Sequence, residues 1–245
     1  MRWLLLFVLT LPLNADAGGA VGNGGDTVHC TANLNVSPFN GWYNLDYLIN
    51  KTADVQFSHD FEKVIGPGDA YDKNFLRIMA AFKEKKYKIL YLDLKEFYDG
   101  IWTNVFGQRY MWKKAPYGVV DLQDERLRQR IPPNCLGQSP QTSVIQTVLR
   151  TQKDWQMRVP NEHSRSVKGA DFTYSTEIVS KLSGLQLSFL LFHEWLRNFT
   201  DNPELIRDAN AIFHSQGWTE DDIDKKLNTL VSIGLHRLQD LRLGF

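Results

Sequence analysis

The sequence has only two cysteines, Cys30 and Cys135, in 245 residues. This scarcity leaves two structural alternatives: a single disulfide that closes a loop of about 105 residues, or two buried free thiols. No His-Cys pattern surrounds Cys135, and His29 is a direct neighbour of Cys30 that would point to the opposite face of a strand. The cysteines therefore predict a structural role and not a nucleophile.

Long hydrophobic runs are also missing after the first residues. No stretch beyond them approaches the roughly 20 apolar residues that a membrane-spanning helix needs. The short run at residues 3–13 follows Arg2 and precedes Ala15-Asp16-Ala17, which is the pattern of a cleavable signal peptide. We therefore predict that residues 1–17 are a signal peptide and that the mature, soluble protein is periplasmic or secreted. No cysteine stands at the cleavage point, so a lipid anchor is not expected.

The sequence has no excess charge of either sign, since 28 Lys and Arg residues face 28 Asp and Glu residues. A balanced charge gives no electrostatic reason to expect nucleic acid or an anionic membrane as a partner. The glycines between residues 18 and 26 lack the Lys-Ser/Thr of a phosphate-binding loop, so they indicate a flexible lead. There is no internal repeat and no low-complexity tract.

The order of the expected elements predicts one α+β domain over residues 18–245. Short strands are expected near residues 28–32, 117–122 and 142–150, and a helix over 72–87; residues 44–49 and 89–94 each fit a strand or a helix. Residues 161–170 are polar and predict a loop, and residues 100–118 an irregular aromatic stretch. Three helices are expected in the last third, starting near Ser183, Asn202 and Thr219. We expect a small antiparallel sheet, formed by the N-terminal and middle segments, to pack on this helical bundle.

The candidate site is a His-Glu pair, His193 and Glu194, in a segment that is apolar on all sides from Phe189 to Phe192. Such a helix is expected to be buried, and a buried polar pair must be satisfied because an unpaired buried charge is costly. His-Glu also begins the His-Glu-x-x-His pattern of zinc peptidases, in which two imidazoles bind zinc and the glutamate is the general base. Here Arg197 takes the place of the second histidine, and a permanent cation cannot bind a metal ion.

Three interpretations follow. A zinc site could be rebuilt from His193 with His163, Asp208 or His214. Catalysis without a metal could use Glu194 or His193 as a general acid or base. In the third, the pair is structural: Glu194 meets Arg197 or Arg207 and fixes how two helices dock.

The aromatic residues between 100 and 118 could line a groove for a glycan or a peptide, or pack beneath a long loop. We favour packing beneath a loop.

Several short motifs together resemble an uncharacterised group of exported bacterial proteins. They are a Gly-Gly-Asp lead ending at Asp26, a Pro-x-x-Cys segment ending at Cys135, a His-Glu helix at His193, and an Arg-x-x-Asn helix from Arg207 to Asn210. The resemblance implies an envelope or secreted setting and a Cys30–Cys135 link, and it brings no known activity. It singles out His193, Glu194, Arg207 and Asn210 as residues on two adjacent helices.

From the sequence we predict an exported structural or binding module of the cell envelope, whose partner is an envelope component, a peptide or a glycan. No cofactor is expected. The alternative is a degenerate zincin-like or metal-free hydrolase that uses His193 and Glu194, with zinc as the cofactor of the metal-dependent form.

Overall fold

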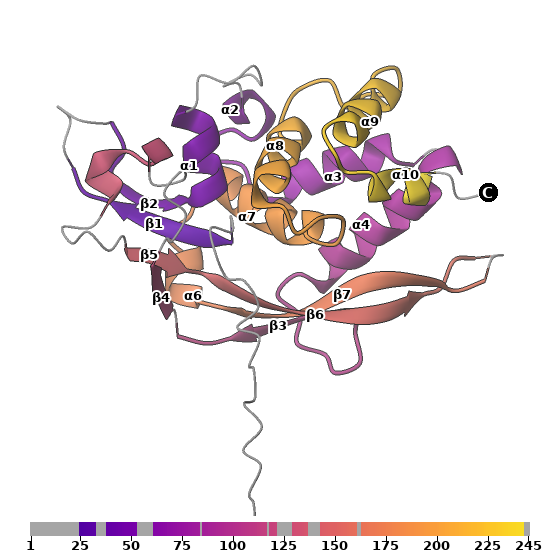
Figure 1. The fold of residues 1–245 in the computed structure, drawn as a ribbon, viewed down its shortest axis with the longest axis horizontal. Helices are drawn as coiled ribbons and strands as arrows, with labels where there is room; N and C mark the ends of the chain where they lie inside the picture. Colours follow the sequence, from indigo (N-terminus) through magenta and orange to yellow (C-terminus); the bar gives the residue numbers. More distant parts are fainter. Residues whose placement is uncertain are drawn as a thin grey trace, which may run out of the picture.

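The computed structural model describes residues 25–32, 38–52, 61–83, 85–116, 118–121, 129–136, 143–160 and 163–242. The predicted signal peptide and the Gly-rich lead as far as Gly24 lie outside these residues. Within them the chain is α+β with a helical C-terminal part, as the sequence predicted, and its strands form two small sheets where one was expected (Figure 1).

The first sheet joins segments that are far apart in the sequence. Its strands are β1 (Asp26–Cys30), β2 (Gly41–Asn44), β4 (Gly118–Asp121) and β5 (Ser143–Gln146). They lie in the order β2-β1-β5-β4, and every neighbouring pair is antiparallel. The expected strands near 28–32 and 117–122 are therefore confirmed within the described residues.

The disulfide between Cys30 and Cys135 is present, with an S–S distance of 2.03 Å. It ties β1 to a short 3-10 turn, Pro133–Cys135. The Asn134 side chain lies beside it and donates hydrogen bonds of 2.8 Å to the carbonyls of Thr31 and Phe39. The disulfide alternative is thus the correct one, and both cysteines are buried.

The second sheet has three strands, β3 (Tyr110–Lys114), β6 (Val148–Met157) and β7 (Arg165–Tyr174), in the order β3-β7-β6. β6 and β7 form a long antiparallel hairpin, whereas β3 runs parallel to β7. Only Thr147 separates β5 from β6, so the strand expected over 142–150 passes from one sheet into the other.

Two expectations for this region were wrong. Residues 165–170, placed in a loop because they are polar, belong to the central strand β7. Residues 110–114, placed in the irregular stretch, form β3. Both segments are strands because they pair with neighbouring strands. Neither has the regular alternation of apolar and polar residues from which a strand can be predicted.

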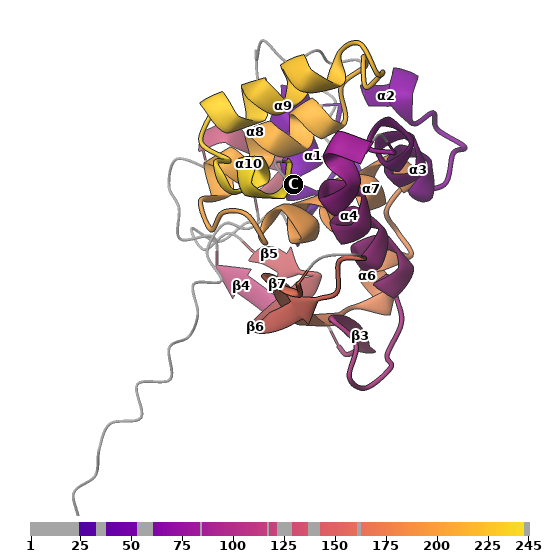
Figure 2. The same ribbon diagram turned by 90° about the vertical axis from the view of Figure 1, so that its right-hand side faces the viewer.

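The helices gather on one side of the three-stranded sheet (Figures 1 and 2). They are α1 (Leu45–Thr52), α2 (Phe61–Val64), α3 (Asp72–Ala81), α4 (Lys88–Gly100), α6 (Thr176–Val179), α7 (Gly184–Leu196), α8 (Pro203–Phe213), α9 (Ile223–Ser232) and α10 (Arg237–Arg242). The ambiguous residues 89–94 are thus helical, and residues 45–49 belong to α1. None of the described helices is long and apolar enough to cross a membrane.

Side chains mark the helix ends where the sequence predicted them. The Ser183 hydroxyl accepts a hydrogen bond of 3.3 Å from the Gln186 amide at the start of α7. Asn202 Oδ1 accepts from the Glu204 amide at 3.0 Å at the start of α8, where Pro203 is the first helical residue. The third predicted helix is divided into α9 and α10 at Gly234, whose φ of 123° favours glycine.

The core lies between the three-stranded sheet and the helices, and α7 passes through its middle. This helix is in contact with α1, α3, α8 and β2. Aromatic rings fill the surrounding space: Phe192 packs on Phe75, with 4.2 Å between ring centroids, and Trp112 on Phe172, with 4.1 Å. Because α7 has neighbours on nearly every side, its all-round apolar sequence is explained.

Candidate functional site

His193 and Glu194 lie in the last turn of α7, and both are fully buried. Neighbouring helical positions point in directions about 100° apart, so the two side chains enter different surroundings. His193 meets α1 and α8, and Glu194 meets β6 and the residue that precedes β1.

The His193 ring is hydrogen-bonded to Asp46, a residue of α1 that is equally buried. His193 Nδ1 is 2.8 Å from Asp46 Oδ2. Asn210 of α8 donates from Nδ2 to the same carboxylate oxygen at 2.9 Å and to the Phe189 carbonyl of α7 at 2.8 Å. One carboxylate therefore joins α1, α7 and α8.

The charge state of Asp46 determines which ring nitrogen of His193 carries a proton. Burial by itself would raise the pKa of Asp46, but His193, Arg207 and Asn210 together hold it below its usual value. The group is therefore a carboxylate, which can only accept hydrogen bonds. It follows that His193 carries a hydrogen on Nδ1 and donates a hydrogen bond from this atom to Asp46 Oδ2.

Glu194 lies between two arginines. Its Oε2 is 3.9 Å from Nη1 of Arg150, on β6, and 3.9 Å from Nη1 of Arg197, one turn further along the chain. The expected pairing with Arg197 is therefore present, but that with Arg207 is not: Arg207 instead contributes to the field that lowers the pKa of Asp46. Both Glu194 carboxylate oxygens are buried and make no hydrogen bond to any of the described residues.

Gly25 leaves just enough room for the Glu194 carboxylate. A Cβ atom added to Gly25 would lie 2.5 Å from Glu194 Oε1, closer than such contacts occur. Any larger residue at this position would displace the buried acid. Asp26, which the resemblance singled out as the end of a Gly-Gly-Asp lead, is the first residue of β1.

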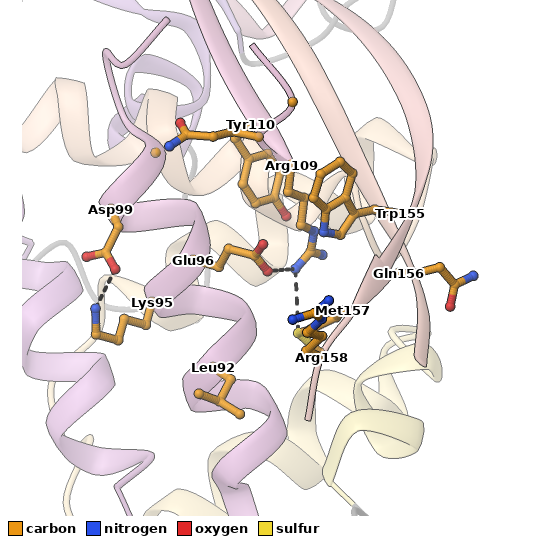
Figure 3. A pocket seen from close by; sticks show the side chains of 13 residues that line it. Leu92, Lys95, Glu96, Asp99, Arg109, Tyr110, Trp155, Gln156, Met157 and Arg158 are labelled. Carbon is orange, nitrogen blue, oxygen red and sulfur yellow. Dashed lines mark hydrogen bonds and ion pairs between the residues drawn. The ribbon is translucent and has the colours of Figure 1, made fainter. Parts of the chain in front are cut away.

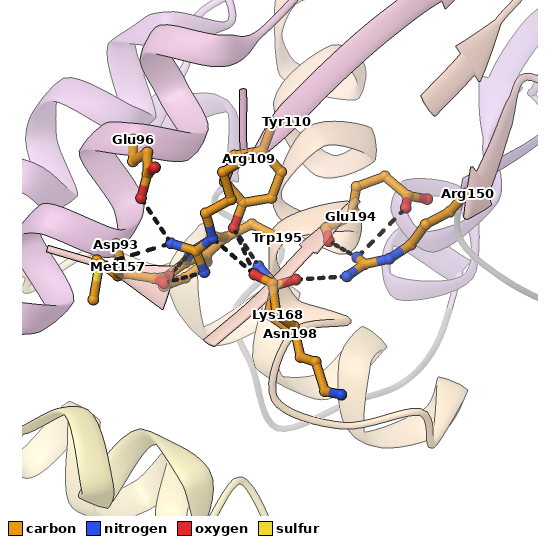
Figure 4. Close-up of polar contacts among 10 residues, drawn as sticks. All are labelled: Asp93, Glu96, Arg109, Tyr110, Arg150, Met157, Lys168, Glu194, Trp195 and Asn198. Carbon is orange, nitrogen blue, oxygen red and sulfur yellow. Dashed lines mark hydrogen bonds and ion pairs between the residues drawn. The ribbon is translucent and has the colours of Figure 1, made fainter. Parts of the chain in front are cut away.

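Arg150 anchors a polar network that continues away from Glu194 (Figure 4). Its guanidinium donates to the Glu194 carbonyl and to Asn198 Oδ1, and Asn198 Nδ2 donates to the Tyr110 hydroxyl at 2.8 Å. Because the side chain is buried, its pKa is lowered to about 10, so it is still a cation at neutral pH. The network links α7 to β6 and β3.

A second buried arginine, Arg109, completes this network on the side of α4. Its Nη2 donates to Asp93 Oδ1 at 2.6 Å and its Nη1 to Glu96 Oε2 at 3.1 Å. Trp195 of α7 donates from Nε1 to the other Asp93 oxygen at 2.7 Å. α4 is thus held to α7 and to the start of β3 by one shared carboxylate.

The residues proposed for a rebuilt zinc site do not gather around His193. His163 is exposed and precedes β7. His214 is buried but already uses both ring nitrogens, Nδ1 with the Asn210 carbonyl and Nε2 with the Ser188 hydroxyl, each at 2.8 Å. Asp208 is half-buried on α8, and burial raises its pKa. Among the described residues, no three His, Cys, Asp or Glu side chains come together in a way that could hold a metal ion.

Two grooves on the described part of the chain lie away from the His-Glu pair. The larger, about 530 Å³, runs between α4 and the end of β6, with Arg109 at its base (Figure 3). The smaller, about 290 Å³, lies beyond Arg109, next to α10. Neither groove is lined by His193, Glu194 or Asp46.

Aromatic residues of the stretch 100–118 are mostly internal. Tyr110 and Trp112 are buried, and Trp102 packs against Trp112 with 4.9 Å between ring centroids. Phe106 differs, because 96% of its side-chain surface is exposed at the tip of the loop before β3. These three residues are thus internal and do not line a groove for a glycan or a peptide among themselves, but Tyr110 and Trp112 lie on β3 and pack in the main core, not beneath a loop.

No family model, curated protein or solved structure matches this chain. The resemblance to a group of exported bacterial proteins thus remains a prediction, and the site has to be interpreted from its own geometry.

Proposed function

We propose that the chain is an exported structural or binding module of the cell envelope, in which the His-Glu helix holds the fold together. The observation that carries this proposal is the complete burial of His193, Glu194 and Asp46 among the described residues, and none of the three lines either of the two grooves described above. A catalytic pair must reach its substrate. These side chains instead make their contacts with other elements of the same domain.

The contacts themselves fit a docking role. Asp46 joins three helices, and Arg150 joins α7 to both outer strands of the second sheet through Glu194, Asn198 and Tyr110. Buried polar groups of this kind fix which surfaces meet, since a misplaced helix would leave charges unpaired. The same contacts would position a binding groove on the surface.

The export part of the proposal is supported by the N-terminal sequence pattern and by the disulfide, since disulfides persist mainly in oxidising compartments. Expression of the full chain in a bacterium, followed by N-terminal sequencing of the periplasmic fraction, tests it. We expect the mature chain to begin at Gly18. A full-length chain that stays in the cytoplasm, with its cysteines reduced, would contradict export.

A hydrolase is the second candidate, and one specific observation favours it. His193 is oriented through Nδ1 by a carboxylate, as metal-binding and general-base histidines often are, while its Nε2 has no partner among the described residues. The carboxylate of Glu194, the next residue in the sequence, likewise makes no hydrogen bond to any of the described residues. In the metal-dependent form of this candidate, Nε2 of His193 would bind zinc and Glu194 would act as a general base.

Zinc content and stability, measured together, separate the two candidates. The purified mature chain is compared with His193→Gln and with a matched control, His214→Gln, which alters another buried histidine. We expect both substitutions to lower the free energy of unfolding and neither to change the zinc content. One zinc per chain that His193→Gln loses and His214→Gln retains would overturn the proposed role in favour of the hydrolase.

A further inference from the structure

The groove between α4 and β6 has the size and the walls of a ligand site. Its volume of about 530 Å³ lies within the range of about 300–1,000 Å³ found for small-molecule pockets. One face of α4 forms one wall, the end of β6 forms the other, and the loop before β3 closes one end (Figure 3).

The base of the groove is rigid because Arg109 is bonded in several directions. Its guanidinium donates to Asp93, Glu96 and the Lys168 carbonyl. The absence of a side chain at Gly169 makes room for it, since a Cβ there would lie 2.7 Å from the Arg109 carbonyl oxygen and 3.0 Å from its Cγ. A pre-formed wall lowers the entropic cost of binding.

Most charges of the groove are already paired. Lys95 is paired with Asp99 across one turn of α4, and Arg109 with Glu96. Arg158 adds a third base at the β6 wall, so three bases and two acids line the groove. A third acid, Asp93, is buried next to the groove and is paired with Arg109. A strongly charged ligand would gain little here and would have to compete with existing ion pairs. An uncharged ligand rich in hydroxyl groups can instead add hydrogen bonds to carboxylate and guanidinium groups that are already in place.

The walls also offer apolar surface beside these polar groups. Half-buried Trp155 and buried Met157 extend from β6, and Leu92 faces them from α4. An indole face next to paired acids and bases suits a sugar ring, which presents C–H groups on one face and hydroxyls around its edge.

We propose that this groove binds a neutral saccharide, with Trp155 as the surface on which a sugar ring stacks. This inference rests on the proposed binding role and names its ligand class. It does not involve His193 or Glu194. A peptide is the competing occupant. An extended peptide would need a run of strand backbone to pair with, and the groove is lined by only the last residues of β6, from Trp155 to Met157.

Isothermal titration calorimetry on the mature chain tests the proposal. The probes are cellotriose, maltotriose and tri-N-acetylchitotriose at millimolar concentration, with penta-alanine as the peptide probe. We expect at least one saccharide to bind, Trp155→Ala to weaken it by about tenfold or more, and Trp155→Phe to retain most of the affinity. The matched control is Leu149→Ala, which alters a half-exposed residue of the same strand outside the groove, and should leave the affinity unchanged.

Thermal unfolding followed by circular dichroism establishes which variants are folded. The proposal is overturned if no saccharide binds to the folded wild-type chain, if a folded Trp155→Ala variant binds the saccharide as tightly as the wild type, or if penta-alanine binds in place of the sugars. None of these results depends on the zinc and stability measurements on His193. A failure of the saccharide proposal can therefore be distinguished from a failure of the proposed structural role of the His-Glu helix.

Discussion

His193 and Asp46 are 147 positions apart in the sequence, yet His193 Nδ1 and Asp46 Oδ2 lie 2.8 Å apart in a fully buried contact. The carboxylate also accepts a hydrogen bond from Asn210, so that α1, α7 and α8 meet at one oxygen atom. A buried charge held in this way is costly to leave without its partners. The contact therefore makes the packing of three helices depend on one acid.

Removal of that acid is expected to destabilise the protein strongly. Asp46→Asn keeps the size of the side chain but removes its charge, so the hydrogen bonds from His193 and Asn210 lose their ionic component. The new amide NH2 would take the place of Oδ1, which has no hydrogen-bond partner among the described residues. We expect the free energy of unfolding in urea to fall by on the order of 3 kcal/mol. The surface pair Lys181–Glu177 is the control, since Lys181→Ala should cost at most about 1 kcal/mol. Equal effects of the two substitutions would contradict the role of Asp46.

The buried position of the Glu194 carboxylate is predicted to require a glycine at position 25. In Gly25→Ala the new methyl group would lie 2.5 Å from Glu194 Oε1, so the carboxylate would have to leave the position in which its other oxygen lies 3.9 Å from Arg150 and from Arg197. We expect a loss of about 1–3 kcal/mol in unfolding free energy. Gly68→Ala is the matched control, because nothing lies within 4 Å of its added Cβ. If Gly25→Ala is as stable as Gly68→Ala, the close packing of Glu194 against Gly25 is wrong.

The buried His214 is expected to make the unfolding free energy of the protein depend on pH. Burial lowers its pKa from 6.5 to about 3, and the neutral ring is satisfied by Ser188 and the Asn210 carbonyl. Between pH 6.5 and about 3 the unfolded chain therefore binds a proton that the folded chain does not. The contribution of His214 to stability is complete above pH 6.5 and is lost as the pH falls through this range, with a slope of up to about 1.4 kcal/mol per pH unit.

Urea unfolding of the wild type and of His214→Gln at several pH values between 4 and 7 measures this slope. The variant should be less stable at pH 7 and should show a smaller decline towards pH 4. Parallel curves for the two proteins would mean that His214 titrates alike in the folded and unfolded states.

Several features were predictable from the sequence because they depend on local chemistry. Ser183 and Asn202 have short polar side chains that satisfy the free amides at the start of α7 and α8. The apolar run before His193 indicated burial on all sides, and two cysteines behind a predicted signal peptide indicated a disulfide. The helix starts and the burial needed only a few neighbouring residues, and the disulfide needed only the count of cysteines and the predicted compartment.

Other features could not be predicted because they depend on contacts between distant segments. Asp46 stands in the first turn of a helix, where an acid usually indicates no more than a favourable interaction with the helix dipole. Arg150 lies in a strand of mixed polarity, and nothing near it in the sequence indicates that it meets Glu194. The polar residues of β7 are likewise placed by pairing with β6 and β3.

The disulfide is expected to stabilise the fold by restricting the unfolded chain. Cys30 and Cys135 close a loop with a sequence separation of 105, and such a loop corresponds to about 4–5 kcal/mol as an upper value. Labelling of the denatured, unreduced protein with a thiol reagent should find no free sulfhydryl. Cys30→Ser with Cys135→Ser should lower the melting temperature, whereas reducing agent should leave the melting temperature of this double variant unchanged. Two labelled thiols per chain in the wild type would show that the link does not form.

A double-mutant cycle between Asp46 and His193 is the most direct test of the proposal that the His-Glu helix holds the fold together. The unfolding free energies of the wild type, Asp46→Asn, His193→Gln and the double variant are measured in urea. If the contact docks α7 on α1, the two substitutions are strongly non-additive, with a coupling energy of about 1–3 kcal/mol. A coupling energy near zero, with His193→Gln as stable as the wild type, would contradict it.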